Sequence, residues 1–122
     1  MKKVLFVCVE NAGRSQTAKG FFNKFTTKAV ADSAGIQPAD HVDSKAITVM
    51  KEAGIDISTY TPKSLTVSMN NEFDYVVTMD CINGYPLTPK EKTIKWDIED
   101  PKDKSIEKYR EIGTLLKFMS KI

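Results

Sequence analysis

Apolar and polar positions along the 122-residue chain follow two periods, and these predict strands and helices in alternation. Short apolar runs rich in β-branched residues are typical of buried strands. Such runs occupy positions 3–9, 29–33, 75–79 and 93–98. The sequence therefore predicts four strands.

Other segments repeat their apolar residues at the spacing of a helix. A first helix is predicted over about 14–26, where one face carries Ala18, Phe21, Phe22 and Phe25. A second helix is predicted to begin at Asp43 or Ser44, because either side chain can cap it. Its apolar face carries Ala46, Val49, Met50 and Ala53, and Gly54 is expected to end it.

Two more helices complete the pattern. Pro62 suits a first helical turn, and it predicts a short helix through Leu65 to about Met69. The last helix is predicted from about Ser105, with one face formed by Ile112, Leu115, Leu116 and Met119. Strands that alternate with helices indicate an α/β fold with a parallel sheet and right-handed crossovers.

Composition places the chain among ordinary globular proteins. Apolar residues make up 41% and charged residues 28%, and the length suits one domain over residues 1–122. The net charge of +2 is too small to indicate nucleic-acid binding. No segment reaches membrane-spanning length, and the apolar run Val4–Val9 is too short for a signal peptide. We therefore expect a cytoplasmic location and neither nucleic-acid nor membrane partners.

The two cysteines, Cys8 and Cys81, are expected to be free thiols in such a reducing compartment. His41 is the one histidine, and it lies in a polar turn where solvation is the simplest interpretation. Because zinc needs three or four ligands and the chain has no C-x-x-C pair, no metal site is predicted. No cofactor is predicted either.

Cys8 ends the first predicted strand, and ligands of parallel sheets bind beyond such strand ends. The five residues that follow, Val9, Glu10, Asn11, Ala12 and Gly13, must turn tightly before a helix begins near Arg14. Their amides can converge into an anion-binding nest at the positive end of that helix. Gly13 can take a positive φ freely, and Asn11 tolerates it better than most residues.

Arginine is rare in this chain, with two arginines against sixteen lysines. The planar fork of Arg14 can grip two oxygens of a tetrahedral anion. This environment is expected to lower the pKa of Cys8, and Ser15 can donate a hydrogen bond to its sulfur. The carboxylate of Glu10 would repel a dianion, so we expect it to face solvent. An activated nucleophile is thus favoured over the alternative of an inert, buried strand-end thiol.

The run CVENAGRS, from Cys8 to Ser15, resembles the signature loop of the low-molecular-weight protein tyrosine phosphatase and thioredoxin-type arsenate reductase superfamily. Later segments resemble parts of the same superfamily in order: DSAGI from Asp32, GIDIS from Gly54, PKSL from Pro62, DYVVTMD from Asp74 and WDIEDP from Trp96. The resemblance implies a single doubly wound domain with a four-stranded parallel sheet and helices on both faces.

The resemblance also implies roles for individual residues. Cys8 would be the nucleophile, and Asp100, before Pro101, the general acid. Arg14 and the amides of residues 9–13 would form the oxyanion cradle, with Asn11 and Ser15 as its support. A carboxyl group on a mobile loop can protonate a leaving oxygen. The simpler alternative for Asp100 is a solvated acidic loop.

The superfamily contains two chemistries, and the sequence carries signs of both. Cys81 follows a predicted strand, where the reductases have a second cysteine; the third cysteine of such reductases is absent, and Tyr85 stands in that segment. The stretch after Pro101 reads KDKS and lacks the aromatic pair of many phosphotyrosine pockets.

Since a phosphatase needs only parts that the chain has, the sequence favours phosphomonoester hydrolysis, of phosphotyrosine in proteins above all, through a phosphocysteine. Arsenate reduction by Cys8 and Cys81 with thioredoxin or another thiol donor is the alternative, and the substrate would then be a small oxyanion. In the phosphatase interpretation, Cys81 protects oxidised Cys8 or is simply buried. A phosphocysteine carrier is a third hypothesis, against which Arg14 and Asp100 argue because both accelerate turnover.

Overall fold

The computed structural model describes residues 2–79 and 90–120. Four strands form one parallel sheet in the order β2-β1-β3-β4: β1 (Lys2–Cys8), β2 (Ala29–Gly35), β3 (Tyr75–Thr78) and β4 (Thr93–Lys95). The predicted α/β class with a four-stranded parallel sheet is confirmed. The chain order reverses beside β1, and in such sheets ligands bind outside the strand ends at that point.

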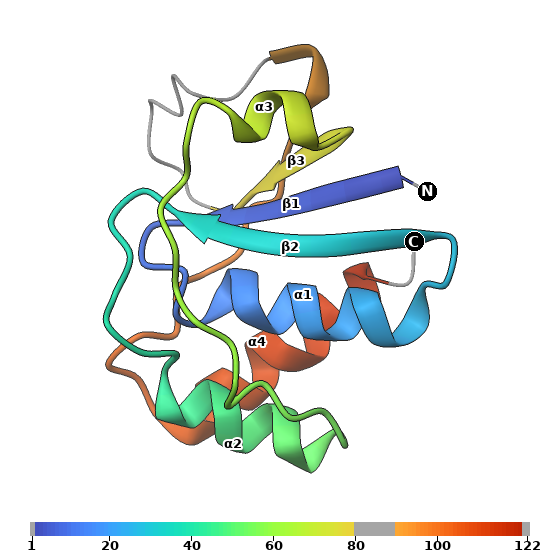
Figure 1. The fold of residues 1–122 in the computed structure, drawn as a ribbon. Helices are drawn as coiled ribbons and strands as arrows, with labels where there is room; N and C mark the ends of the chain where they lie inside the picture. Colours follow the sequence, from blue (N-terminus) through green and yellow to red (C-terminus); the bar gives the residue numbers. More distant parts are fainter. Residues whose placement is uncertain (1, 80–89, 121–122) are drawn as a thin grey trace.

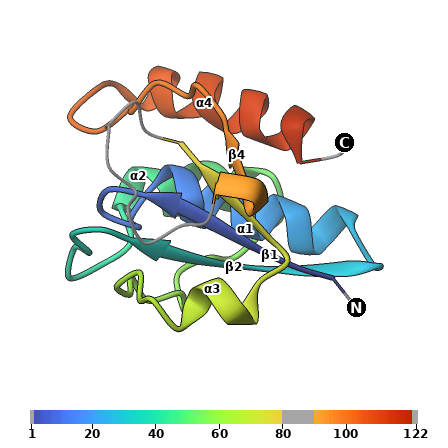
Figure 2. The same cartoon turned by 90° about the horizontal axis from the view of Figure 1, so that it is seen from above.

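Helices cover the two faces of this sheet unequally (Figure 1). On one face lie α1 (Arg14–Phe25) and α4 (Ile106–Met119), and α2 (Ser44–Glu52) packs outside them. The other face is covered by α3 (Met69–Glu72) and the segment before it, as Figure 2 also shows. A further 3-10 turn, Lys90–Lys92, precedes β4.

Each face of the sheet has its own apolar core. Toward α1 and α4, Phe6 and Val77 pack with Ala18, Ile112 and Leu116. Toward α3, alternate residues of the same strands pack with the segment 65–73, namely Leu5, Val7, Ala34 and Val76 against Leu65 and Phe73. Because successive side chains of a strand point to opposite faces, continuous apolar runs can fill both cores.

The second predicted helix is confirmed at both ends. Asp43 is its N-cap, and its Oδ1 accepts a hydrogen bond from the amide of Lys45 at 2.9 Å. Gly54 follows its end with a φ of 81°, a conformation that glycine adopts without strain. His41 is exposed, as expected.

The helix predicted from Pro62 to Met69 is wrong, because Pro62–Leu65 is extended. The Gly35 amide donates to the Lys63 carbonyl, and the Leu65 amide donates to the Gly35 carbonyl, both at 2.8 Å. These bonds attach the segment to the free edge of β2, and Leu65 is buried there. Pairing with the sheet outweighs the helix preference of Pro62, and the helix α3 begins only at Met69.

Three smaller predictions also need correction. The fourth strand ends at Lys95 rather than at position 98. Phe25 and Leu115, predicted on buried helix faces, are 38% and 41% exposed. Both residues lie at the edge of the apolar face of their helix, whereas Phe21 and Leu116 lie at its centre and fill the core.

Candidate active site

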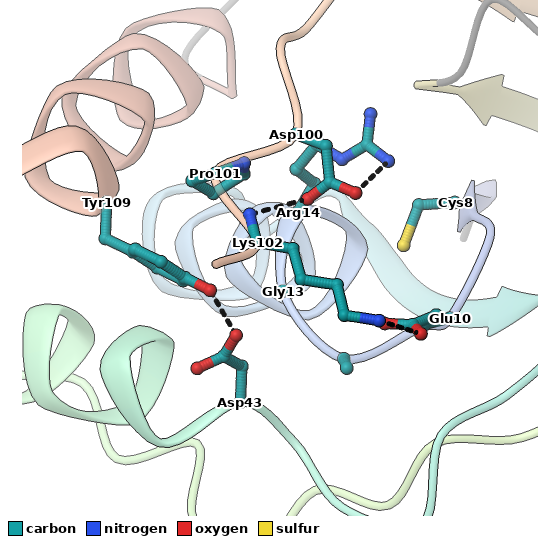
Figure 3. Close-up of a pocket in the computed structure, with 10 residues that line it drawn as sticks. Cys8, Glu10, Gly13, Arg14, Asp43, Asp100, Pro101, Lys102 and Tyr109 are labelled. Atoms are coloured by element: carbon teal, nitrogen blue, oxygen red, sulfur yellow. Dashed lines mark hydrogen bonds and ion pairs between the residues drawn. The ribbon is translucent and has the colours of Figure 1, made fainter. Parts of the chain in front are cut away.

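Cys8 is the last residue of β1, and a five-residue turn separates it from α1. We call this turn, residues 9–13, the cradle loop. Cys8 is 3% exposed, and it lines a cavity of about 20 Å³ that also includes Arg14 and Asp100 (Figure 3). The three residues predicted to be catalytic therefore surround one cavity, although Asp100 is far from the other two in the sequence.

The cradle loop directs its carbonyl groups away from this cavity. The carbonyls of Cys8, Val9, Glu10 and Ala12 accept hydrogen bonds, at 2.8–3.3 Å, from the amides of Ile36, Gln37, Ala39 and Asp43. The carbonyls of Asn11 and Gly13 accept from Gln16 Nε2 and from the Thr17 amide. In a trans peptide the N–H points opposite to the C=O. The amides of residues 9–14 therefore face the concave side of the loop, an arrangement of the kind that binds anions in other proteins.

The start of α1 adds to this nest. Gly13 is the N-cap of α1, and as a glycine it has no side chain that could cap the helix. The first amides of the helix are thus not satisfied by a cap, and the positive end of the helix dipole lies at the nest. Asn11 has a φ of 53°, as its tolerance of this region predicts, whereas Gly13 has a φ of −128° and does not use its freedom to adopt positive φ.

A chain of buried hydrogen bonds supports the loop from behind. Ser33 Oγ donates to Gln16 Oε1 at 2.9 Å, and Gln16 Nε2 donates to Asn11 Oδ1 at 3.1 Å. Asn11 Oδ1 also accepts from the Lys63 amide at 3.0 Å, which fixes the orientation of the Asn11 amide. Asn11 Nδ2 then donates to Ser15 Oγ at 2.7 Å.

The last contact of this chain reaches the nucleophile. Ser15 Oγ lies 2.9 Å from Cys8 Sγ, and either atom can be the donor. Since Asn11 donates to Ser15 Oγ, the hydroxyl proton of Ser15 is available for the sulfur. A hydrogen bond from Ser15 to the sulfur stabilises the thiolate form of Cys8. The predicted supporting roles of Asn11 and Ser15 agree with this geometry.

The pKa of Cys8 differs from the sequence-based expectation. Burial raises the pKa of the Cys8 thiol, and this effect exceeds the lowering by the Ser15 hydroxyl, the loop amides and the Arg14 guanidinium. The predicted lowering is therefore wrong for this structure. The neighbours predicted to lower the pKa act in the expected direction, but the strand end that delivers Cys8 also removes it from water.

The guanidinium of Arg14 is held by the ends of two strands. Its Nη1 donates to the carbonyls of Met79 and Ile98, at 2.6 and 2.9 Å, just after β3 and β4. Its Nη2 lies 3.5 Å from Asp100 Oδ2. Arg14 is 5% exposed, whereas the Asp100 side chain is 52% exposed. A buried cation and an accessible carboxyl group thus meet at the cavity.

Asp100 belongs to an irregular stretch, residues 96–104, which we call the acid segment. Its Oδ1 accepts a hydrogen bond from the Lys102 amide at 3.0 Å. Asp100 is not helical, as Pro101 predicts, and its second carboxylate oxygen faces Arg14. The carboxyl group is therefore placed beside the cavity rather than in a merely solvated loop.

Sequence reasoning missed several residues at the mouth of the cavity. Asp43, Lys102 and Tyr109 line it together with Glu10 and Pro101. The Tyr109 hydroxyl donates to Asp43 Oδ2, and burial together with this carboxylate raises the pKa of Tyr109 well above its usual value. Glu10, which we expected to face solvent, is ion-paired with Lys102. No local pattern indicates these pairs, because each joins distant parts of the chain.

Gly35, the last residue of β2, contacts the cradle loop, and sequence reasoning gave it no role. A Cβ at this position would lie 2.7 Å from the Val9 carbonyl oxygen and 2.9 Å from the Asn11 amide nitrogen. Gly35 therefore allows the loop to pack closely against the end of β2. The signal available in the sequence was the glycine itself, at a strand end beside the strand that carries Cys8.

Cys81 lies outside the described residues. Within 2–79 and 90–120, no group of three or more His, Cys, Asp or Glu side chains could hold a metal ion. Among the helices of those same ranges, none has the length and apolar character to cross a bilayer.

Comparisons with known proteins show the family of the chain. Residues 3–121 match the sequence model of the family described as low molecular weight phosphotyrosine protein phosphatase. The chain belongs to this family, whose members include both phosphatases and arsenate reductases.

Individual relatives represent both activities. A glutaredoxin arsenate reductase of Synechocystis is 36% identical over 92% of this chain and 88% of its own length. A low molecular weight protein tyrosine phosphatase of T. tengcongensis superposes with a TM-score of 0.88 at 30% identity, covering 98% of this chain and 95% of the other. An arsenate reductase in the phosphate-binding state gives a TM-score of 0.85 at 32% identity, with 98% and 94% covered.

Proposed function

We propose that this protein reduces arsenate, using Cys8 as the nucleophile and Cys81 as the second thiol. One observation carries the choice: curated relatives that match 92–95% of the chain at 33–36% identity are named arsenate reductase. The second cysteine agrees with it, because reduction of arsenate to arsenite consumes two thiols. The sequence alone favoured hydrolysis of phosphomonoesters, and the relatives support its alternative better.

The geometry supports the first step at Cys8. The amides of residues 9–14 and the guanidinium of Arg14 would hold three oxygens of the tetrahedral anion, with the arsenic facing the sulfur. Because burial holds Cys8 as a thiol, its proton passes to an oxygen of the bound oxyanion. The sulfur then forms a bond to arsenic as that oxygen leaves as water, with Asp100 beside it to assist the proton transfer.

The second step is a redox step at sulfur. The thiolate of Cys81 attacks Cys8 Sγ, and the electron pair of the sulfur–arsenic bond stays on arsenic. Arsenic is reduced from As(V) to As(III) and leaves as arsenite, while the two cysteines are oxidised to a disulfide. An external thiol donor, thioredoxin or a glutathione-dependent glutaredoxin, then reduces this disulfide. The chain has two cysteines in all, so the disulfide must be resolved from outside.

Phosphatase activity is the second candidate function. The observation in its favour is Asp100, which faces Arg14 at the cavity and can protonate the leaving oxygen of a phosphomonoester. Cys8 would form a phosphocysteine, and water would then release phosphate. A phosphocysteine carrier would stop before that release.

One set of assays distinguishes the three functions. Arsenite formation from arsenate is measured with reduced thioredoxin and, separately, with glutaredoxin and glutathione; phosphate release from p-nitrophenyl phosphate and from a phosphotyrosine peptide is measured beside it. Arsenate reduction that is lost in Cys81→Ser supports the proposal. Steady phosphate release with no arsenite assigns the protein to the phosphatases, and a single stoichiometric burst of phosphate assigns it to the carriers.

A further inference from the structure

Glu10 poses a problem for an anion-binding loop. It is the second residue of the cradle loop, it lines the cavity, and its side chain is 35% exposed. A carboxylate at this position would lie close to a doubly charged oxyanion in the cavity and would repel it. Some other feature of the structure has to offset this repulsion if the loop is to bind a dianion.

Lys102 supplies the opposite charge from another part of the chain. Its Nζ donates to Glu10 Oε1 at 2.5 Å, across 92 positions in the sequence. The two side chains meet at the mouth of the cavity (Figure 3). Glu10 raises the pKa of Lys102, so the ammonium stays charged throughout the physiological range.

The charges around the cavity explain why this single lysine matters. Among the described residues that line the cavity, three are acidic, namely Glu10, Asp43 and Asp100, and two are basic, namely Arg14 and Lys102. Lys102 provides half of the positive charge of these five residues, and without it their formal balance falls from −1 to −2. Asp43 and Asp100 already have the partners Tyr109 and Arg14.

We propose that Lys102 supports oxyanion binding by neutralising Glu10, which lets the cradle loop accept small tetrahedral dianions. The inference rests on the proposed function, since it concerns the oxyanion that this function requires. Lys102 acts through Glu10 rather than on the anion itself. Its contribution is therefore needed only while Glu10 is charged.

A double-mutant cycle with inorganic phosphate as the probe tests this. Phosphate binding is measured by calorimetry at low ionic strength for the wild type, Lys102→Met, Glu10→Gln and the double variant. Lys102→Met is expected to weaken binding about fivefold, at the upper end of what exposed ion pairs contribute. Glu10→Gln is expected to bind at least as well as the wild type. The double variant is expected to return to within about twofold of the wild type, because a neutral amide side chain at position 10 needs no partner.

Lys104→Met is the matched control. Lys104 pairs with Glu99 in the same acid segment, with similar exposure, and neither residue lines the cavity. This variant should bind phosphate as the wild type does, and the loss in Lys102→Met should shrink at high salt.

The possible failures are distinguishable. If Lys102→Met binds phosphate as tightly as the wild type, or if the double variant stays as weak as Lys102→Met, the inference is overturned while the proposed function stands. If the wild type binds neither phosphate nor arsenate, the proposed function fails and the inference fails with it.

Discussion

Ser15 offers the sharpest test of the hydrogen-bond chain behind the cradle loop. Its hydroxyl is buried, accepts from Asn11 Nδ2 at 2.7 Å, and lies 2.9 Å from Cys8 Sγ. The direction of the chain leaves the hydroxyl proton of Ser15 available to donate to a Cys8 thiolate. Replacing Ser15 by alanine removes this donor without adding volume, so the thiolate of Cys8 loses a stabilising bond while the thiol loses little.

The size of the effect follows from the kind of bond. A hydrogen bond to a charged group contributes about 1.5–3 kcal/mol, and one pKa unit corresponds to about 1.4 kcal/mol. Ser15→Ala should therefore raise the pKa of Cys8 by about one to two units. At a fixed pH below both pKa values, the thiolate fraction should fall by about tenfold to a hundredfold.

Alkylation by iodoacetamide measures this fraction directly, because the thiolate is the species that reacts. The comparison is made in a Cys81→Ser background, so that Cys8 is the single thiol of the protein. Ser68→Ala serves as the control, since Ser68 is exposed and precedes α3 on the other face of the sheet. An unchanged or faster alkylation of Cys8 in Ser15→Ala would refute the assignment of Ser15 as donor.

Three further predictions concern other parts of the site. Arg14→Lys keeps the charge but cannot hold the Met79 and Ile98 carbonyls while facing the anion, so kcat should fall about 10²–10³-fold in steady-state assays; near-normal turnover would mean that a point charge suffices. Gly35→Ala should lower the free energy of unfolding in urea by about 1–3 kcal/mol, because its Cβ meets the Val9 carbonyl. Gly13→Ala should cost less, because no atom of the described residues lies within 4 Å of its Cβ. The pKa of Cys8 is raised in the folded protein, so above about pH 8.5 the thiol ionises first in the unfolded chain. The wild type should therefore lose stability with rising pH relative to Cys8→Ala, by up to about 1.4 kcal/mol per pH unit. Parallel curves of unfolding free energy against pH for the two proteins would contradict the raised pKa.

Local signals predicted those parts of the fold that depend on local sequence. The strand that ends at Cys8 and the helix that begins at Arg14 follow from an apolar run, a turn and a helical repeat. The left-handed conformation of Asn11 follows from the tolerance of asparagine for it. The helix predicted from Pro62 was wrong, because the extended form of this segment depends on hydrogen bonds to Gly35, which no local pattern encodes.

The sequence predicted that Cys8, Arg14 and Asp100 gather at one place, but it did not predict the residues around them. Gln16 and Ser33 support Asn11 only because α1 packs beside β2. The pair between Lys102 and Glu10 likewise depends on how the acid segment folds over the loop. The pKa of Cys8 was mispredicted because charges and donors can be read from a sequence, whereas the burial that opposes them is a property of the folded chain.

The central claim is that inward-facing amides of the cradle loop bind a tetrahedral oxyanion at Cys8. Titration of ¹⁵N-labelled protein with inorganic phosphate, followed by ¹H–¹⁵N correlation spectra, measures this at each amide. The account predicts saturable shifts concentrated on the amides of residues 9–14, with those of α3 unmoved. Phosphate binding that leaves the amides of residues 9–14 unshifted would contradict it.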